Sequence, residues 1–310
     1  MDERIKKYIM RQSLDLINKF SDYISNNTSL SKYSWFNLGG PAEYLFKPKN
    51  KNQLIDFLKE NKKSKLKITT LGAGSNTLIR DKGVKGVVIK LGLGFSEIEL
   101  INRDTMRVGA ATLDRKISNF AKENSIGNLE FLSCIPGSIG GSVIMNSGCY
   151  GNEISKILRS VNVIDFNTCE EKEISRENIN FFYRGTNLSN ELIITSVKLK
   201  GDIKSKEEIE KKQIEFIEKK KISQPSQIKT CGSTFKNVST EKKAWQIIKE
   251  AGCDNFKVGD AFISKKHCNF FVNNGKAKAS DIEKLINKIK KTVNDKSGVN
   301  LDLEIKIIGE

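Results

Sequence analysis

The N-terminal stretch alternates apolar and charged positions at helical spacing. Ile5, Ile9, Leu14, Ile17 and Phe20 recur every three to five residues, which predicts an amphipathic helix within residues 1–24. Similar patterns predict further helices at 51–60, 114–125, 204–221 and about 281–296. Ser280 and Glu283 have the spacing of a capping box, and Gly298 stands where the last of these helices would end.

Short apolar runs between glycine-rich turns predict the β-strands. They are expected within 67–71, 86–91, 106–112, 161–166, 191–201 and 301–309. Helices and short strands therefore alternate irregularly, which indicates an α+β fold. A chain of 310 residues exceeds the length that one hydrophobic core usually supports, so two or three domains are expected.

Composition narrows the class of protein. The hydrophobic fraction is 38%, no apolar run is long enough to span a bilayer, and the N-terminus lacks the apolar core of a signal peptide. We therefore expect a soluble, cytoplasmic protein. Its six cysteines form no CxxC pair, which indicates free thiols, and no metal site is expected.

The formal net charge of +16 raises the alternative of a nucleic-acid-binding protein. Only 9 of the 53 basic residues are arginines, however, and the lysines are scattered through amphipathic stretches with no concentrated patch or aromatic platform. This distribution favours a solvated lysine-rich surface. Such a surface would still attract a small phosphorylated substrate.

Two glycine-rich segments are candidates for binding an anion. "GAGSN" at 72–76 lacks the third glycine of a dinucleotide fingerprint, and neither it nor "IPGSIGGSVIMNSGCYG" at 135–151 ends like a P-loop. Consecutive small residues nevertheless let backbone N–H groups converge on an anion. Each loop alone is more often a tight turn, but two in one region favour a ligand of dinucleotide size.

A serine stands out in "KTCGSTFKN" at 229–237, where Ser233 follows a glycine in a turn. Nucleophilic catalysis would require a base, and the sequence offers a single histidine, His267, in an apolar stretch where a structural role is expected. A three-histidine zinc site is impossible. Ser233 could instead protonate a strongly basic carbanion or enolate formed beside it.

Six segments in order carry a resemblance to a known family. "LGAGSNTLIRD", "IPGSIGGSVIMNSGCYG", "FFYRGT", "CGSTFKN", "HCNFFVN" and "LDLEIKIIG" resemble the UDP-N-acetylenolpyruvoylglucosamine reductases, from about residue 28 onward. The resemblance implies a PCMH-type (vanillyl-alcohol-oxidase-like) FAD-binding domain in two subdomains, at 1–95 and 96–203. A C-terminal α+β substrate-binding domain is then expected at 204–310.

The resemblance also implies roles for individual residues. The residues that would bind FAD are Gly72, Gly74, Ser75, Asn76, Gly137, Ser138, Gly140 and Gly141. Arg184 would bind the enolpyruvyl carboxylate, Ser233 would donate a proton, and Glu304 would help to stabilise the enolic intermediate. The residues that would contact the substrate without taking part in the chemistry are Tyr183, Asn237 and Lys306.

The activity implied is NADPH-dependent, FAD-mediated reduction of UDP-N-acetylenolpyruvoylglucosamine to UDP-N-acetylmuramate, a step in peptidoglycan precursor synthesis. FAD is expected to be non-covalent, since His267 lies outside the FAD region, and no nucleic-acid, membrane or obligate protein partner is expected. The sequence departs from the family at Val238, often proline, and at Lys306, usually arginine. Little room after Gly185 indicates the shorter, type II form. The alternative is another FAD-linked oxidoreductase of the same superfamily.

Overall fold

The computed structural model describes residues 3–239 and 241–310, with side chains omitted for 3–7 and 9. The chain forms two compact units. Unit 1 contains the described part of residues 1–26 together with 44–73 and 86–217, and unit 2 contains 27–43, 74–85 and 218–310. The chain passes between the units within strands β1, β2 and β5, after Ala73 and within helix α6.

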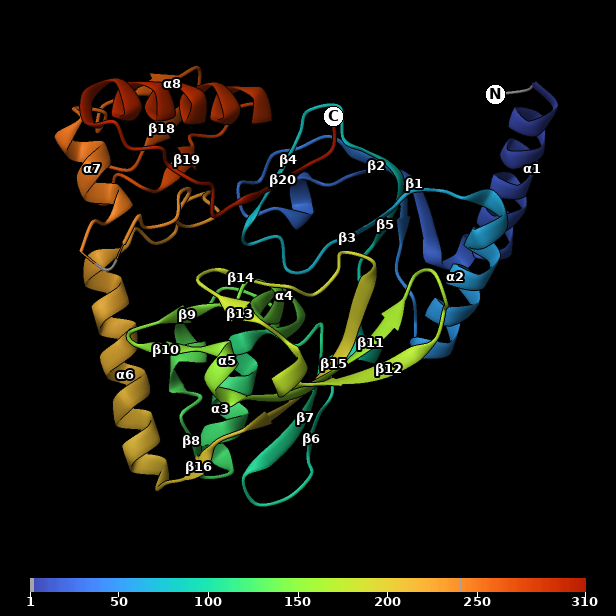
Figure 1. Cartoon of the computed structure of the whole chain (residues 1–310), viewed down its shortest axis with the longest axis horizontal. Coiled ribbons are helices and arrows are strands. Elements are labelled where there is room, and N and C mark those ends of the chain that lie inside the picture. Colours follow the sequence, from blue (N-terminus) through green and yellow to red (C-terminus); the bar gives the residue numbers. More distant parts are fainter. Residues whose placement is uncertain (1–2, 240) are drawn as a thin grey trace. The chain divides into compact units, whose positions relative to one another are not determined.

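Helices and strands alternate irregularly along the chain (Figure 1). The α-helices are α1 (Glu3–Lys19), α2 (Lys51–Ser64), α3 (Asp114–Glu123), α4 (Ile139–Ile144), α5 (Ile154–Ile157), α6 (Lys206–Ser223), α7 (Ala244–Glu250) and α8 (Ala279–Ser297). Short 3₁₀ turns lie at Ser21–Tyr23, Ser31–Tyr33, Leu93–Phe95, Glu130–Cys134 and Arg176–Asn178.

The strands are mostly short, and they fall into small separate sheets. The first ten are β1 (Ile24–Ser29), β2 (Pro41–Phe46), β3 (Ile68–Thr70), β4 (Thr77–Ile79), β5 (Val84–Ile89), β6 (Ile98–Leu100), β7 (Thr105–Gly109), β8 (Ile126–Gly127), β9 (Gly148–Cys149) and β10 (Asn152–Glu153). The others are β11 (Leu158–Asp165), β12 (Glu171–Ser175), β13 (Phe181–Phe182), β14 (Gly185–Thr186), β15 (Leu192–Lys200), β16 (Asp202–Ile203), β17 (Lys257–Val258), β18 (Ala261–Ile263), β19 (Phe271–Asn273) and β20 (Lys306–Ile308).

A five-stranded antiparallel sheet, in the order β12-β11-β15-β7-β6, forms the centre of unit 1. Its middle strands carry β-branched residues that pack well on a pleated surface, and Val161 pairs with Val197 in the core. Helix α4 contacts β15 and β7, and Ile117 of α3 lies in the same core. The sheet therefore provides a rigid base for the glycine-rich segment that contains α4.

Helix α1 packs beside α2, as Figure 1 shows. Leu16, Ile17 and Phe20 are buried, and Phe20 meets the ring of Phe57 edge-on at 5.4 Å. Leu14, which the sequence pattern placed on the apolar face, is 51% exposed, so that part of the prediction was wrong. The buried face is displaced because Leu16 and Ile17, rather than Leu14, point toward α2. The side chains of Ile5 and Ile9 lie outside the described residues.

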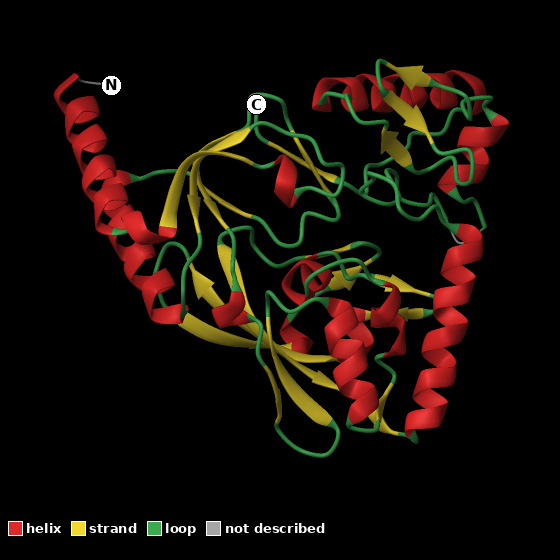
Figure 2. Cartoon of the chain, turned by 180° about the vertical axis from the view of Figure 1, so that it is seen from behind, coloured by secondary structure: helices red, strands yellow, loops and turns green. Residues whose placement is uncertain are grey.

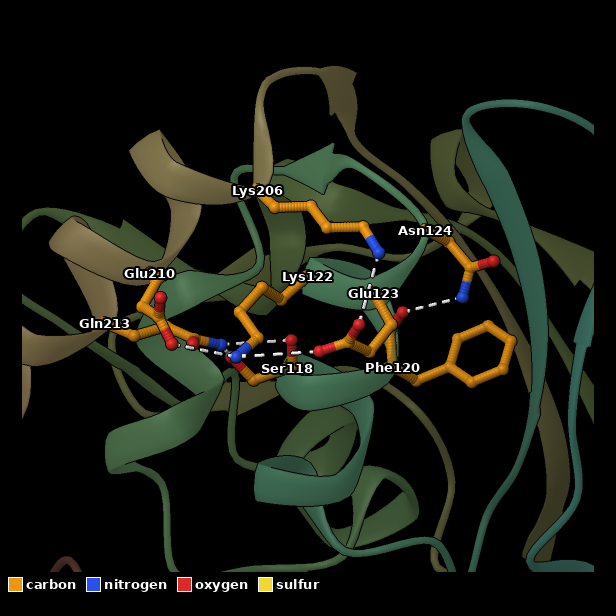
Figure 3. A network of polar contacts seen from close by, with 8 residues as sticks. All are labelled: Ser118, Phe120, Lys122, Glu123, Asn124, Lys206, Glu210 and Gln213. Carbon is orange, nitrogen blue, oxygen red and sulfur yellow. Dashed lines mark hydrogen bonds and ion pairs between the residues drawn. The ribbon is translucent and has the colours of Figure 1, made fainter.

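Polar contacts fasten the first half of α6 to α3 within unit 1 (Figure 3). Buried Gln213 donates through Nε2 to the carbonyl and hydroxyl oxygens of Ser118, at 3.0 and 2.7 Å. Two ion pairs flank this buried contact, Lys122–Glu210 at 3.0 Å and Lys206–Glu123 at 3.2 Å. Exposed ion pairs contribute little, so the buried amide is the contact that specifies how α6 packs on α3.

Unit 2 is built on α7, α8 and the three-stranded sheet β17-β18-β19. In Figure 2, α8 runs along these strands, and its Ile282, Leu285 and Ile289 are fully buried in the core of the unit. Gly298 ends the helix with φ +67°, as the sequence predicted. The last strand, β20, is only three residues long and pairs in parallel with β4.

The N-terminus of α8 differs from the sequence prediction. The predicted capping box of Ser280 and Glu283 does not form. Instead, the carboxylate of Asp81 accepts hydrogen bonds from the N–H groups of Ala279 and Ser280 at 2.7 and 3.0 Å, and Glu283 pairs with Arg80. A distant aspartate thus satisfies the donors that a local cap usually satisfies. Within the described part of the chain, no helix is long and apolar enough to span a bilayer.

Candidate active site

The two predicted glycine loops meet in unit 1. A Cβ atom on Gly72, in the turn after β3, would lie 3.1 Å from Oγ of Ser138, which precedes α4. A side chain at position 72 would therefore require the Ser138 hydroxyl to move by a few tenths of an ångström. The close approach brings two short backbone segments side by side, as binding a dinucleotide phosphate requires.

The second loop, around Gly137, packs against the buried carboxylate of Asp114. A Cβ atom on Gly137 would lie 2.9 Å from Oδ2 of Asp114, and that oxygen accepts a hydrogen bond of 2.6 Å from the Ser142 hydroxyl. Asp114 is completely buried, its Oδ1 has no hydrogen-bond partner within the described part of the chain, and burial raises its pKa to about 7. Gly140 donates its N–H to the carbonyl of Ala110, so Gly140 can offer close approach rather than a donor.

Lys90 fixes the first loop. Its Nζ donates to the carbonyl oxygen of Gly72 at 2.6 Å. Burial lowers the pKa of Lys90, and the positive charge of Lys47 lowers it further. The end of β5 thus places a positive charge directly against one of the glycine loops.

Residues 74–76 of "GAGSN" belong to unit 2, where Asn76 is hydrogen-bonded to the C-terminal segment. Gly74 has φ +68°, and a Cβ atom there would overlap the carbonyl oxygen of Tyr33. The Asn76 side chain donates to the carbonyl of Glu304 at 3.0 Å, and the Asn76 carbonyl accepts from the N–H of Lys306 at 2.9 Å. Asn76 is therefore a structural link to Glu304, whatever else it contacts.

The segment that follows Ser233 is held in place by hydrogen bonds to Asn269. Thr234 donates its N–H to the carbonyl of Asn269, and the buried Asn269 side chain exchanges two hydrogen bonds with the backbone of Phe235. Ser233 itself is partly exposed, and among residues 3–239 and 241–310 its hydroxyl has no hydrogen-bond partner. The backbone is fixed while the hydroxyl remains available to a ligand.

Glu304 lies on the segment beside Ser233. Its N–H donates to the carbonyl of Thr234 at 2.8 Å, so the two residues predicted to act in catalysis are held on neighbouring segments of unit 2. Lys306, two residues further on, is exposed at the start of β20. This arrangement explains how residues 71 positions apart in the sequence come together.

Asn237 and His267 both have structural contacts. The Oδ1 atom of Asn237 accepts from the N–H of Ala244, which starts α7. The ring of His267 lies against Trp245 and Phe270, and its Nδ1 accepts from the N–H of Asn269 at 3.3 Å. Burial lowers the pKa of His267, which keeps the ring neutral near pH 7. The expected structural role of this histidine agrees with these contacts.

Arg184 occupies a strained position in a tight turn of unit 1. Phe182 pairs with Gly185, so Tyr183 and Arg184 form a two-residue turn between β13 and β14. Arg184 has φ +57°, a region that glycine or asparagine usually occupies. Its Nη2 donates to the carbonyl of Gly148 at 3.0 Å, and its guanidinium lies 5.1 Å from the ring centre of Tyr183. Strained residues cluster at functional sites, although a helix end can also contain one, as Lys65 after α2 does.

The structure thus groups the predicted residues within each unit. Gly72 and the Gly137–Gly141 loop meet in unit 1, which also contains Tyr183 and Arg184; Asn76, Ser233 and Glu304 are linked in unit 2. Sequence reasoning missed the supporting residues Lys90, Asp114 and Asn146. Only Asn146 carried a local signal, since it lies within the most glycine-dense segment.

The glycine cradle fits the diphosphate of FAD. Gly72 and Gly137 stand where any side chain would meet a neighbouring residue, and Lys90 supplies a cation at the edge of the first loop. No cluster of three or more His, Cys, Asp or Glu residues that could hold a metal occurs in the described ranges.

Comparison with known proteins identifies two domains in this chain. The profile of the UDP-N-acetylenolpyruvoylglucosamine reductase C-terminal domain matches residues 224–308, and that of an FAD binding domain matches residues 42–174. The predicted α+β fold with a PCMH-type FAD-binding domain is thereby confirmed, together with the likeness to the solved structure described next.

Relatives extend the match over nearly the whole chain. The UDP-N-acetylenolpyruvoylglucosamine reductase of Pelagibacter ubique is 46% identical over 96% of this chain and 99% of its own length, and that of Rickettsia canadensis is 42% identical over 91% and 94%. The crystal structure of the UDP-N-acetylenolpyruvylglucosamine reductase from Thermus caldophilus superposes with a TM-score of 0.79 at 31% identity, covering 92% of this chain and 98% of that one. The chain belongs to the UDP-N-acetylenolpyruvoylglucosamine reductase family.

Proposed function

We propose that the protein catalyses the FAD-mediated, NADPH-dependent reduction of UDP-N-acetylenolpyruvoylglucosamine to UDP-N-acetylmuramate. The observation that carries this proposal is the 46% identity to a reductase of that name over 96% of the chain. A different FAD-linked oxidoreductase of the same superfamily would not account for the match of residues 224–308 to the C-terminal domain of the reductases.

FAD would be held by the backbone of the two glycine loops, with Gly72, Ser138 and Gly141 nearest to where they meet. When bound, it would supply the hydride chemistry that connects NADPH to the terminal carbon of the enolpyruvyl group. The positive charge of Lys90, next to Gly72, would offset part of the charge of the diphosphate.

Arg184 would bind the carboxylate of the enolpyruvyl group. A guanidinium grips a carboxylate with two parallel hydrogen bonds, and the bond from Arg184 to Gly148 limits the directions in which that grip can point. When the hydride adds to the terminal carbon, the electron pair of the double bond moves toward the carboxylate. Arg184 then stabilises the second negative charge as it develops.

Glu304 and Ser233 would complete the reaction. A protonated Glu304 can donate a hydrogen bond to the enolate oxygen, and the Ser233 hydroxyl can give its proton to the carbon that carries the ether oxygen, which produces the lactyl ether. Support for the second role comes from the exposure of Ser233 and the lack of a hydrogen-bond partner for its hydroxyl within the described ranges.

Several finer properties belong to the same proposal. The donor is NADPH, the reaction takes place in the cytoplasm, and its product serves peptidoglycan synthesis and so cell shape and division. Tyr183, Asn237 and Lys306 would contact the UDP-sugar, and no obligate protein partner is needed. The proposed domains are two FAD-binding subdomains at 1–95 and 96–203 and a substrate-binding domain at 204–310. The loop after Gly185 would be the short one of the type II form.

Purified protein tests the proposal directly. It should be yellow and release FAD on denaturation, because no histidine lies where a covalent link could form. NADPH oxidation should depend on the enolpyruvyl substrate, and the product should carry two additional hydrogen atoms by mass spectrometry. Correctly folded, colourless protein that cannot be reconstituted with FAD would rule the proposal out.

A further inference from the structure

Asn146, within the glycine-rich segment, is buried and contacts the arginine turn at Phe182. It follows α4, its side chain is 2% exposed, and its backbone has φ +40°, a region that asparagine tolerates better than most residues. Its N–H donates to the carbonyl of Val143 at 3.0 Å, which ties it to the end of α4. The backbone alone therefore fixes where the Asn146 side chain begins.

Both ends of the Asn146 amide are engaged. Its Oδ1 accepts from the N–H of Ser155 at 3.1 Å, and its Nδ2 donates to the carbonyl of Phe182 at 3.3 Å. One partner is a donor and the other an acceptor, so only one orientation of the amide satisfies both. An aspartate of the same shape could satisfy Ser155 but would oppose the carbonyl of Phe182 with an oxygen.

The Phe182 carbonyl belongs to the residue that begins the arginine turn. From the other side, Arg184 donates to the carbonyl of Gly148, two residues after Asn146. Two of the hydrogen bonds between these segments therefore run in opposite directions. One of these bonds uses the guanidinium itself, and the other uses only Asn146 and the backbone.

A tight turn with a non-glycine residue at φ +57° persists only where its surroundings hold it. Gly185 follows at once, and a Cβ atom there would lie 2.2 Å from the ring of Phe182, so the turn is closely packed on that side. If the guanidinium leaves Gly148 to bind the substrate, the hydrogen bond from Asn146 to the Phe182 carbonyl can remain, because it does not involve the guanidinium.

We propose that Asn146 is a positioning residue for Arg184: its amide holds the Phe182 carbonyl and so keeps the turn in the conformation that aims the guanidinium at the substrate carboxylate. This inference rests on the proposed function of Arg184. Asn146 does not touch the reacting atoms. It sets the geometry of a residue that does, and it connects that residue to the segment that carries the glycine loop.

Two substitutions in the FAD-loaded protein separate the amide from the backbone. Asn146→Asp keeps the shape and the acceptor for Ser155 but removes the donor to Phe182. Asn146→Gly keeps the left-handed backbone without strain, removes the amide and buries no charge, so it remains informative if the aspartate variant folds poorly. Asn27→Asp, at an exposed asparagine with φ +46°, is the matched control.

Stopped-flow measurement of the two half-reactions gives the first readout. Flavin reduction by NADPH should stay within about twofold of wild type in both Asn146 variants, while flavin reoxidation by substrate should slow by about 10- to 100-fold, the effect of misaligning a binding group. In an Arg184→Ala background, the same Asn146 substitutions should change reoxidation by less than about threefold, because Asn146 acts through Arg184. Equal factors in both backgrounds, or equal losses in both half-reactions, would overturn the inference.

Hydrogen exchange gives a readout that does not depend on activity. Amides of residues 181–186 should exchange several times faster in Asn146→Asp and Asn146→Gly than in wild type or Asn27→Asp. Unchanged exchange would overturn the inference even if turnover falls. Wild-type flavin that is not reoxidised by the enolpyruvyl substrate would instead contradict the proposed function, and the exchange experiment would still decide the role of Asn146.

Discussion

The side chain of Asn76 donates a hydrogen bond of 3.0 Å to the main-chain carbonyl of Glu304. Asn76 lies at the end of a glycine loop expected to bind FAD, and Glu304 is expected to act on the substrate. A residue of the loop expected to bind FAD thus supports the backbone at Glu304. The sequence alone suggested only the first of these roles.

Replacing Asn76 with alanine should therefore destabilise the protein even without FAD. The hydrogen bond from Asn76 to the Glu304 carbonyl would be lost, which costs about 1 kcal/mol of unfolding free energy for a partly buried hydrogen bond. Urea denaturation of the FAD-free wild-type and Asn76→Ala proteins measures this difference. If Asn76 acted only on the cofactor, the two FAD-free proteins would unfold at the same urea concentration.

Ser233→Ala should separate the two half-reactions. Flavin reduction by NADPH needs no proton from serine and should be nearly unchanged, while reoxidation by substrate should slow by ~10²–10⁴-fold, typical of losing a positioned acid. The melting temperature should barely move, because among the described residues nothing hydrogen-bonds to the hydroxyl. Stopped-flow absorbance with a thermal melt checks both. Surviving reoxidation by substrate would remove Ser233 as the proton donor.

Two substitutions of Arg184 should differ in stability although both abolish its role in turnover. Arg184→Gly and Arg184→Ala both remove the guanidinium, but only glycine adopts φ +57° without strain. The glycine variant should be more stable than the alanine variant by about 1 kcal/mol, measured by urea denaturation. Both should lose turnover, and Arg184→Lys should also be impaired because lysine lacks the planar fork. Near-normal turnover in the lysine variant would argue against a bidentate grip.

Asp81 should stabilise unit 2 only above acidic pH. Partial burial raises the pKa of Asp81, but the hydrogen bonds from Ser280 and Ala279 outweigh it, and the pKa lies below its ordinary value of 3.8. The stabilisation is thus present above pH 3.8 and disappears as the pH falls through the lowered pKa. Asp81→Ala should cost about 0.5–2 kcal/mol at pH 7, as loss of a helix cap does. Urea denaturation at pH 7 and below pH 4 should show the difference between the proteins shrinking in acid.

Asp114 should have the opposite pH dependence. Burial raises its pKa to about 7 in the folded protein, so the folded state holds the proton more tightly than the unfolded chain does. Its contribution to stability is fully present below about pH 4 and is lost as the pH rises toward 7. The isosteric Asp114→Asn variant cannot titrate and should resist urea better than wild type at pH 8 relative to pH 5. Parallel pH profiles for the two proteins would contradict a raised pKa.

The sequence predicted those parts of the fold that depend on local patterns. The periodicity of α3, α6 and α8 placed these helices within a few residues, and Gly298 marked the end of α8. The short helix α7 was missed, and the last strand was predicted three times too long, because β20 pairs with only the three residues of β4 and begins at Lys306. Strand length is set by a neighbour that the local sequence does not reveal.

For the site, motif order identified the residues expected to meet substrate and cofactor, but not the residues that support them. The cap of α8 comes from Asp81, 198 residues before Ala279. Asn146 reaches the carbonyl of Phe182 across 36 positions. Such contacts depend on tertiary packing. The sequence does not show whether an asparagine or aspartate side chain binds a ligand or hydrogen-bonds to the backbone of a distant residue. Long-range support is therefore what the structure adds.

The interleaving of the two units limits how this protein can be divided. Residues 218–310 hold most of unit 2, yet Phe36, Leu38 and Leu78 from two earlier segments belong to the same hydrophobic core. A gene fragment that encoded only the C-terminal portion would leave that core with a gap where three buried side chains belong. Recombination between relatives at a single crossover cannot exchange one unit intact. A crossover that replaced residues 218–310 would leave the two earlier segments of unit 2 from the other parent.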